Sequence, residues 1–149
     1  MSTPEEMVSE AVRAALKSGE RERTSTLRML LNDIRNERIR EQIAVDETGF
    51  LLLVRRAVKQ RQESATQYAD GGRQELADKE RREIEILEVY LPEEVDEGEL
   101  RQVIAELIAA EELSGPAAIG PLMKLMMSRY AGRVDGGRIN QLAREALVG

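Results

Sequence analysis

The 149-residue chain contains neither cysteine nor histidine, and the two absences exclude several kinds of chemistry. Without cysteine there is no disulfide framework, no thiolate nucleophile and no thiolate metal site. Without histidine the chain also lacks a common zinc ligand and the side chain that most often transfers protons near neutral pH. We therefore expect no bound metal and no cofactor.

Aromatic residues and long apolar runs are also scarce. The chain has no tryptophan, one phenylalanine and three tyrosines, and Phe50, Tyr68, Tyr90 and Tyr130 are scattered. A stacking platform for single-stranded bases is therefore not expected, so an RNA partner would be recognised by backbone and shape. No segment approaches the roughly 20 apolar residues of a membrane span. Because the acidic start MSTPEEMVSE does not resemble a signal peptide, we expect a cytoplasmic protein with no membrane partner.

The formal net charge of −6 is distributed unevenly along the chain. Residues 13–61 carry 12 Lys and Arg against 7 Asp and Glu, whereas residues 62–116 carry 5 against 16. Residues 117–149 are basic again, with 5 against 2. Polyanion binding responds to such local patches, so the acidic total does not exclude an RNA partner. The alternative is that charged helices simply keep themselves solvated in this way.

The residues that are abundant are strong helix formers, with apolar side chains at helical spacing. The pattern predicts seven helices, over about 4–18, 20–41, 46–69, 73–91, 96–110, 121–130 and 136–147. The stretch LPEEVDEGEL separates residues 1–92 from residues 93–149. We therefore predict an all-α protein with an N-terminal four-helix, hairpin-type unit and a small three-helix C-terminal unit.

Three charged residues fall within the apolar stripes of two predicted helices. Arg61 lies on the stripe of the third helix, and Glu80 and Glu83 lie on the stripe of the fourth. The stripe of the fourth helix otherwise contains Leu76, Ile84, Leu87 and Leu91. Because a buried guanidinium needs an anion, we expect Arg61 to form a structural ion pair with one of these carboxylates. The alternative is a catalytic Arg/Glu group that completes another chain's site.

Two sets of polar side chains are candidates for RNA binding. On the second and third helices they are Arg28, Arg35, Arg55, Arg56 and Lys59, which form one basic surface if those helices lie side by side and are otherwise a solvated face. In the C-terminal unit they are Lys124, Arg129, Arg133, Arg138, Asn140 and Arg144.

The second set surrounds the turn RYAGRVDGGRIN, residues 129–140. Gly132 is expected to end one helix in the left-handed conformation, and Asp135 is expected to cap the next helix. The turn itself is then structural. The residue that folding leaves without a role is Arg133, followed by its basic neighbours.

Several runs, taken together, resemble the YqeY-like family. They are RTSTLRMLLNDIRNERI (23–39), VKQRQESATQYADGGRQELADKERREIEILEVYLPEEV (58–95), IGPLMKLMM (119–127) and GRVDGGRIN (132–140). The family shares its C-terminal region with the tail of the B subunit of the tRNA-dependent amidotransferase, GatB. The resemblance implies an all-helical accessory domain that contacts tRNA. It also implies the family's usual grouping with carbon–nitrogen ligases that use glutamine as amide donor.

The chain departs from the family pattern at two positions. After Gly-Arg-x-Asp-Gly the family usually has a lysine, whereas here Gly137 takes that place and Arg138 follows. The basic side chain is thereby displaced by about 100° around the helix. Pro121 also stands where the family usually has a lysine. Both departures lower the basic charge available for a phosphate contact.

We predict a tRNA-binding accessory module, associated with tRNA-dependent amidation or aminoacylation, which is not catalytic by itself. Releasing ammonia from glutamine needs an activated nucleophile, and no residue pattern in the chain supplies one. The expected partners are tRNA and an aminoacyl-tRNA synthetase or amidotransferase, with no DNA. The alternative is a protein-interaction adaptor for such an enzyme, with no direct RNA contact, which uses acidic residues 62–116 and the methionine-rich helix.

Overall fold

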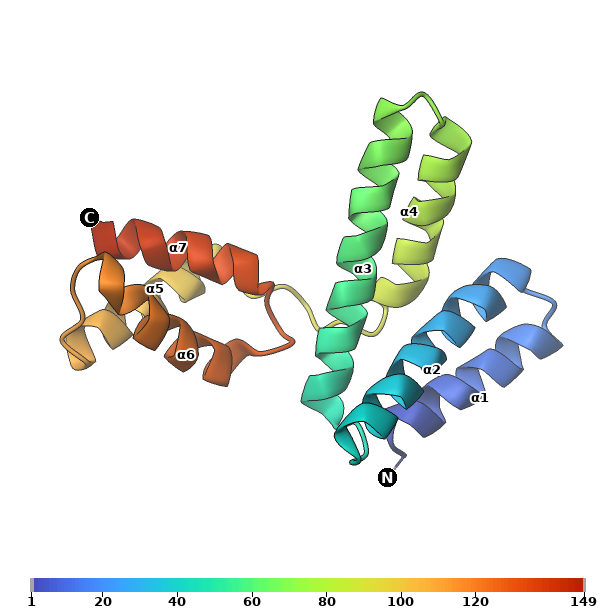
Figure 1. Ribbon diagram of the computed structural model, residues 1–149, viewed down its shortest axis with the longest axis horizontal. Helices are drawn as coiled ribbons and strands as arrows, with labels where there is room; N and C mark the ends of the chain where they lie inside the picture. Colours follow the sequence, from blue (N-terminus) through green and yellow to red (C-terminus); the bar gives the residue numbers. More distant parts are fainter. Residues whose placement is uncertain (1, 149) are drawn as a thin grey trace. The chain divides into compact units, whose positions relative to one another are not determined.

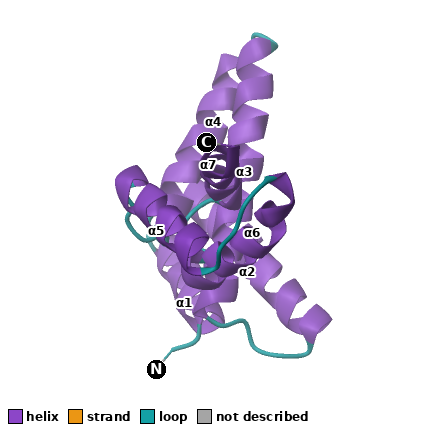
Figure 2. Ribbon diagram, turned by 90° about the vertical axis from the view of Figure 1, so that its left-hand side faces the viewer, coloured by secondary structure: helices purple, strands orange, loops and turns teal. Residues whose placement is uncertain are grey.

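The computed structural model describes residues 2–148, and within this range every regular element is a helix (Figures 1 and 2). The α-helices and one 3-10 helix, η1, are α1 (Pro4–Lys17), α2 (Arg21–Glu41), α3 (Glu47–Asp70), α4 (Gln74–Glu88), α5 (Glu97–Ala110), η1 (Pro116–Ala118), α6 (Ile119–Tyr130) and α7 (Gly136–Val148). The prediction of an all-α fold is confirmed. The chain divides between Leu91 and Pro92 into two compact units, called unit 1 and unit 2 below.

Unit 1 consists of two helical hairpins, α1–α2 and α3–α4 (Figure 1). Helix α2 contacts all three other helices of the unit, so it forms the centre of the core. Its Leu27, Leu30 and Ile34 are buried together with Val54 of α3 and Leu87 of α4. Apolar residues three and four positions apart produce this continuous buried stripe.

Side-chain caps define where two helices of unit 1 begin. The hydroxyl of Thr3 accepts a hydrogen bond from the N–H of Glu6 at 3.2 Å, and Pro4 occupies the first turn of α1. The carboxylate of Asp46 accepts from the N–H of Gly49 at 2.8 Å and starts α3. Each cap satisfies a backbone donor that the first helical turn leaves unpaired.

Helix α4 differs from its prediction in where it ends and in which side chain it buries near its start. It ends at Glu88, because the next backbone bonds, from Tyr90 to Leu87 and from Leu91 to Glu88, are i to i−3 bonds of a tightened last turn. Pro92 disfavours helical geometry at the residue before it. At the other end Leu76, which the apolar pattern places in the core, is 39% exposed, whereas Ala77 is fully buried.

Unit 2 packs α5, α6 and α7 around one apolar cluster. Its fully buried side chains include Leu100, Ile104, Leu122, Met126 and Ile139. Helix α6 begins at Ile119, two residues before the predicted start at Pro121, because proline is tolerated in the first turn of a helix. The packing of the three helices places Tyr130, at the end of α6, against Glu99 of α5.

Candidate nucleic-acid interface

The turn between α6 and α7 is fixed by its backbone. The N–H of Ala131 donates to the carbonyl of Met127 at 2.9 Å, and Gly132 then adopts φ +77°, the predicted left-handed conformation. The carbonyl of Asp135 accepts from the N–H of Ile139 at 3.2 Å, which begins α7. These bonds and this conformation account for Gly132 and for the start of α7 without any ligand.

Tyr130 attaches this turn to α5. Its ring is 2% exposed, and its hydroxyl donates a hydrogen bond to the carboxylate of Glu99 at 3.0 Å. Burial raises the pKa of Tyr130, and the hydrogen bond to Glu99 raises it further. The phenol therefore remains a donor at neutral pH. The last residue of α6 is held by a polar contact as well as by the core.

Arg133 has a structural contact that sequence reasoning missed. Its guanidinium carbon lies 5.7 Å from the centroid of the Tyr130 ring, within the range of a cation–π interaction. The prediction that folding leaves Arg133 without a role is therefore wrong. A buried aromatic residue three positions before an arginine, across a tight turn, was the available signal. The contact restricts where the guanidinium lies on the surface of the turn.

The remaining candidates of unit 2 differ in exposure and in partners. Lys124 and Arg129 are exposed on α6, and Arg138 is half-buried at the start of α7. Arg144 donates through Nε to the side-chain oxygen of Asn140 at 2.8 Å. Among residues 2–148, none of these four cations forms an ion pair, whereas the nearby Glu145 pairs with Arg101 of α5 at 3.2 Å.

The candidates of unit 1 do not gather on one surface. Arg35 faces α1, where its Nε lies 3.7 Å from a carboxylate oxygen of Glu5. Arg56 lines a different hollow, which it shares with Asp33, Glu37 and Arg40. The other three are Arg28, exposed beside α1, and the α3 residues Arg55, half-buried, and Lys59, exposed. The α2 candidates Arg28 and Arg35 thus lie beside α1.

The third predicted cluster lies inside unit 1. Arg61 is 8% exposed and its Nε lies 3.2 Å from a carboxylate oxygen of Glu83, which is 7% exposed. Its other nitrogens donate to the carbonyl of Ala57 at 3.0 Å and contact the sulfur of Met29 at 3.6 Å. With these bonds the guanidinium is engaged within unit 1. The geometry favours the structural interpretation over a catalytic one.

Glu80, the second candidate partner of Arg61, is half-buried next to this pair. Burial raises its pKa, and the neighbouring carboxylate of Glu83 raises it further. Lys79 lies 3.9 Å from the other oxygen of Glu83, so that oxygen also faces a cation. The sequence placed both carboxylates on one stripe, and only the packing of α3 against α4 selects Glu83.

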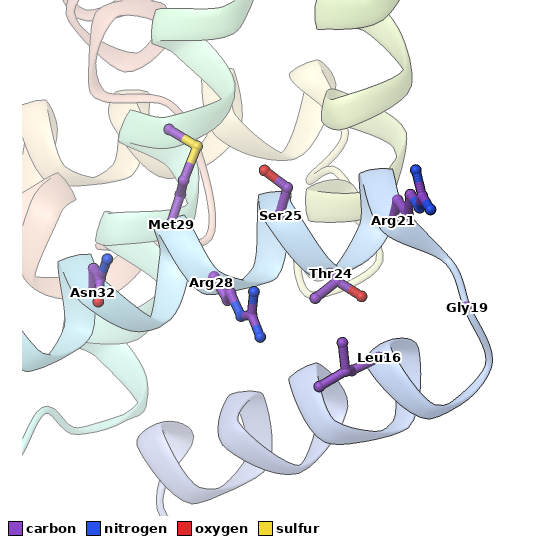
Figure 3. Close-up of a pocket in the computed structure, with 8 residues that line it drawn as sticks. All are labelled: Leu16, Gly19, Arg21, Thr24, Ser25, Arg28, Met29 and Asn32. Carbon is purple, nitrogen blue, oxygen red and sulfur yellow. The ribbon is translucent and has the colours of Figure 1, made fainter.

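An open hollow of about 520 Å³ crosses the outer side of α2 near the end of α1 (Figure 3). Its lining consists of Leu16, Gly19, Arg21, Thr24, Ser25, Arg28, Met29 and Asn32. Sequence reasoning identified Arg28 but not the hollow. The available signal was the recurrence of polar residues every three or four positions, from Arg21 to Asn32, on one side of α2.

The described residues contain neither a membrane-spanning helix nor a cluster of metal ligands. No helix between residues 2 and 148 is long and apolar enough to cross a membrane. Within the same range, no group of three or more acidic side chains lies close enough together to hold a metal ion.

Comparison with known proteins places the chain in a family. Residues 5–147 match the family model described as "Yqey-like protein". Over 61 residues, 41% of this chain, the sequence is 38% identical to a glutamyl-tRNA(Gln) amidotransferase subunit from Methanosarcina barkeri (strain Fusaro / DSM 804). That stretch is 10% of the relative's length, so this chain spans only a small part of it. Because the family model covers nearly the whole sequence, the chain belongs to the YqeY-like protein family.

Proposed function

We propose that this protein is a tRNA-binding accessory module, associated with tRNA-dependent amidation, which does not carry out the chemistry itself. Two findings support the proposal: membership of the YqeY-like family and partial identity with an amidotransferase subunit whose name specifies glutamyl-tRNA(Gln). The proposed role assigns the chain to contacts with the tRNA and leaves amide transfer to a separate catalytic chain.

The observation that carries the proposal is the uncompensated charge of the α6–α7 hairpin. Residues 117–149 contain five cations and two acidic residues, and Glu145 is already paired with Arg101 of α5. Lys124, Arg129 and Arg138 consequently lack an ion pair among the described residues. Cations in this state are free to neutralise phosphates and release counterions, which drives binding to nucleic acids.

The aromatic residues support contact with the RNA backbone rather than with unstacked bases. Phe50 and Tyr130 are 3% and 2% exposed, and Tyr90 packs against Phe50 with ring centroids 5.5 Å apart. These rings are therefore engaged within the protein and do not form a stacking platform. The guanidinium of Arg133 is placed over the Tyr130 ring at the surface of the turn, and its permanent charge suits a phosphate.

The proposal is tested by binding of fluorescently labelled total tRNA at a series of salt concentrations. We expect binding at about 50 mM salt, with an affinity that falls steeply as salt rises. The double variant Lys124→Gln, Arg138→Gln should bind more weakly and reduce the slope of log affinity against log salt by about two. The matched control is Arg13→Gln, Lys17→Gln, which removes the same charge from exposed positions of α1.

Absence of tRNA binding at about 50 mM salt would contradict the proposal. Equal losses in the test and control variants would show that only net charge matters and would also contradict it. The adaptor alternative makes a different prediction. A synthetase or an amidotransferase chain would then be recovered equally well before and after nuclease treatment.

A further inference from the structure

The hollow on α2 has a mixed lining that the proposed tRNA contacts do not use. Figure 3 shows Arg28 and Thr24 directed toward the helix that carries Leu16, while Met29 is directed toward the opposite side of α2. The hollow therefore extends across the solvent-facing surface of one helix and has an apolar side chain at each edge. Cations and polar side chains lie between the two edges.

The two arginines of the hollow differ from the arginines farther along α2. Arg35 and Arg38 both contact Glu5, and Arg40 contacts Glu37 and Glu41. Arg21 and Arg28 form no ion pair among the described residues. They are seven positions apart on the same side of α2, or about 10 Å along the helix axis. This spacing matches carboxylates seven positions apart on a partner helix.

The apolar side chains at the edges of the hollow are each more than half exposed. Leu16 is 57% exposed and Met29 is 51% exposed. The sulfur of Met29 contacts Arg61 at 3.6 Å, and Arg61 is held in turn by its buried bond to Glu83. One edge of the hollow is therefore attached to the core of unit 1, which reduces the entropy lost when a partner binds.

We propose that this hollow is a docking site for an acidic amphipathic helix of a partner protein. Such a helix would place carboxylates opposite Arg21 and Arg28 and would cover Leu16 and Met29 with its own apolar side chains. Burial of exposed leucine and methionine is favourable only against apolar groups, which a phosphate backbone does not provide. The hydroxyl of Ser25, between the two arginines in the sequence, and the amide of Asn32, one turn beyond Arg28, line the same hollow as further hydrogen-bonding groups.

A fluorescently labelled model peptide provides a direct probe. It is a helical peptide with Glu at positions seven apart and leucines on the adjacent stripe, and the control peptide has Gln in place of each Glu. We expect the full chain to bind the Glu peptide in a salt-dependent manner. The double variant Arg21→Gln, Arg28→Gln and the single variant Leu16→Ser should each weaken binding about tenfold or more.

The matched control variant, Arg13→Gln, Lys59→Gln, removes two exposed cations that do not line the hollow, and it should bind as the unaltered chain does. All substituted residues are exposed, and circular dichroism would verify that each variant folds. Failure to bind the Glu peptide at about 100 µM would overturn the proposal. Equal binding by the Arg21→Gln, Arg28→Gln variant, or equal affinity for the Gln peptide, would do the same.

A photocrosslinking amino acid at Ser25 gives an independent measurement in cell extract. We expect a crosslink to a protein segment that is acidic and amphipathic at helical spacing, and that persists after nuclease treatment. A crosslink to RNA, or to a segment without clustered carboxylates, would overturn the proposal. These outcomes do not depend on the tRNA contacts of unit 2, so the two proposals fail separately.

Discussion

Unit 1 and the α6–α7 hairpin of unit 2 differ in how several of their arginines are paired. In unit 1, Arg35, Arg38 and Arg82 contact acidic side chains of other helices, and Arg61 has a buried carboxylate partner. In the α6–α7 hairpin, Arg129 and Arg138 form no ion pair among the described residues. The difference shows that a basic stretch of sequence does not by itself identify a basic surface.

The contrast is clearest between Arg61 and Arg133. Each adjoins another side chain of its own unit, but Arg61 is 8% exposed and paired with Glu83, whereas Arg133 is exposed and lies over the ring of Tyr130. A guanidinium over an aromatic face keeps its charge, because the ring interacts with the face of the group. The first arginine is therefore held inside the fold of unit 1, whereas the second keeps its charge at the surface of unit 2.

The largest effect expected on stability is that of Arg61→Met. The substitution leaves Glu83 buried without its main partner and should lower the free energy of unfolding by about 3–5 kcal/mol. Adding Glu83→Leu removes the uncompensated charge, so the double variant should recover most of the loss. Urea denaturation followed by circular dichroism measures both. A double variant that loses the sum of the two single effects would show that the pair is not the unit of stability.

A smaller effect is expected from Tyr130→Phe, which retains the ring under Arg133 and removes the hydroxyl. Because the bond from Tyr130 to Glu99 is lost, the free energy of unfolding of unit 2 should fall by about 1 kcal/mol. Hydrogen exchange of the amides of α5 and α6 locates the change. If protection is lost equally in α1 and α2, the tyrosine does not act through the contact with Glu99.

The pH dependence of unit 1 should have opposite signs at two carboxylates. Burial raises the pKa of Glu80 above its ordinary value of 4.5, and the charge of Glu83 raises it further. The free energy of unfolding of unit 1 should therefore fall as pH rises from 4.5 through the raised pKa of Glu80. The hydrogen bond from Arg82 lowers the pKa of Glu22, so its stabilising effect is present above pH 4.5 and is lost as pH falls.

Two variants separate these contributions. The unaltered chain should lose stability as pH rises above 4.5, and Glu80→Gln should abolish that loss. It should also lose stability as pH falls below 4.5, and Glu22→Gln should abolish that second loss. The measurement is the free energy of unfolding as a function of pH for both variants and the unaltered chain. If both variants altered the pH dependence in the same direction, burial could not dominate at Glu80 while pairing with Arg82 dominates at Glu22.

The smallest effect on stability is expected from the variant that should weaken tRNA binding. Because Lys124 and Arg138 form no ion pair among the described residues, Lys124→Gln, Arg138→Gln should change the free energy of unfolding by less than about 0.5 kcal/mol. The same variant should weaken tRNA binding. A clear loss of stability would group these cations with Arg61 of unit 1, whose ion pair lies inside the fold.

Local rules were sufficient for most of the helices. Thr3 and Asp46 cap α1 and α3, whose predicted starts lie within about one residue of the observed ones, and Gly132 has the left-handed conformation that its place in the turn predicts. The wrong choice of a buried side chain arose where one helix packs against only part of another helix. Near the start of α4 the buried side chain is Ala77 and not Leu76, because a contact between two helices buries a narrower stripe than a full core does.

The sequence by itself determined the all-α fold, the helices and the need of Arg61 for an anion, because these follow from periodicity, caps and the cost of burying a charge. Only the tertiary structure decided that Glu83 and not Glu80 lies within 3.2 Å of Arg61, that Arg133 lies over Tyr130, and that Arg21 and Arg28 share a hollow with Leu16. The first and the third depend on the rotation and offset of one helix against another, and the second depends on the path of the turn after α6. Those quantities are fixed by the packing of whole side chains, which the apolar pattern of a single helix does not specify.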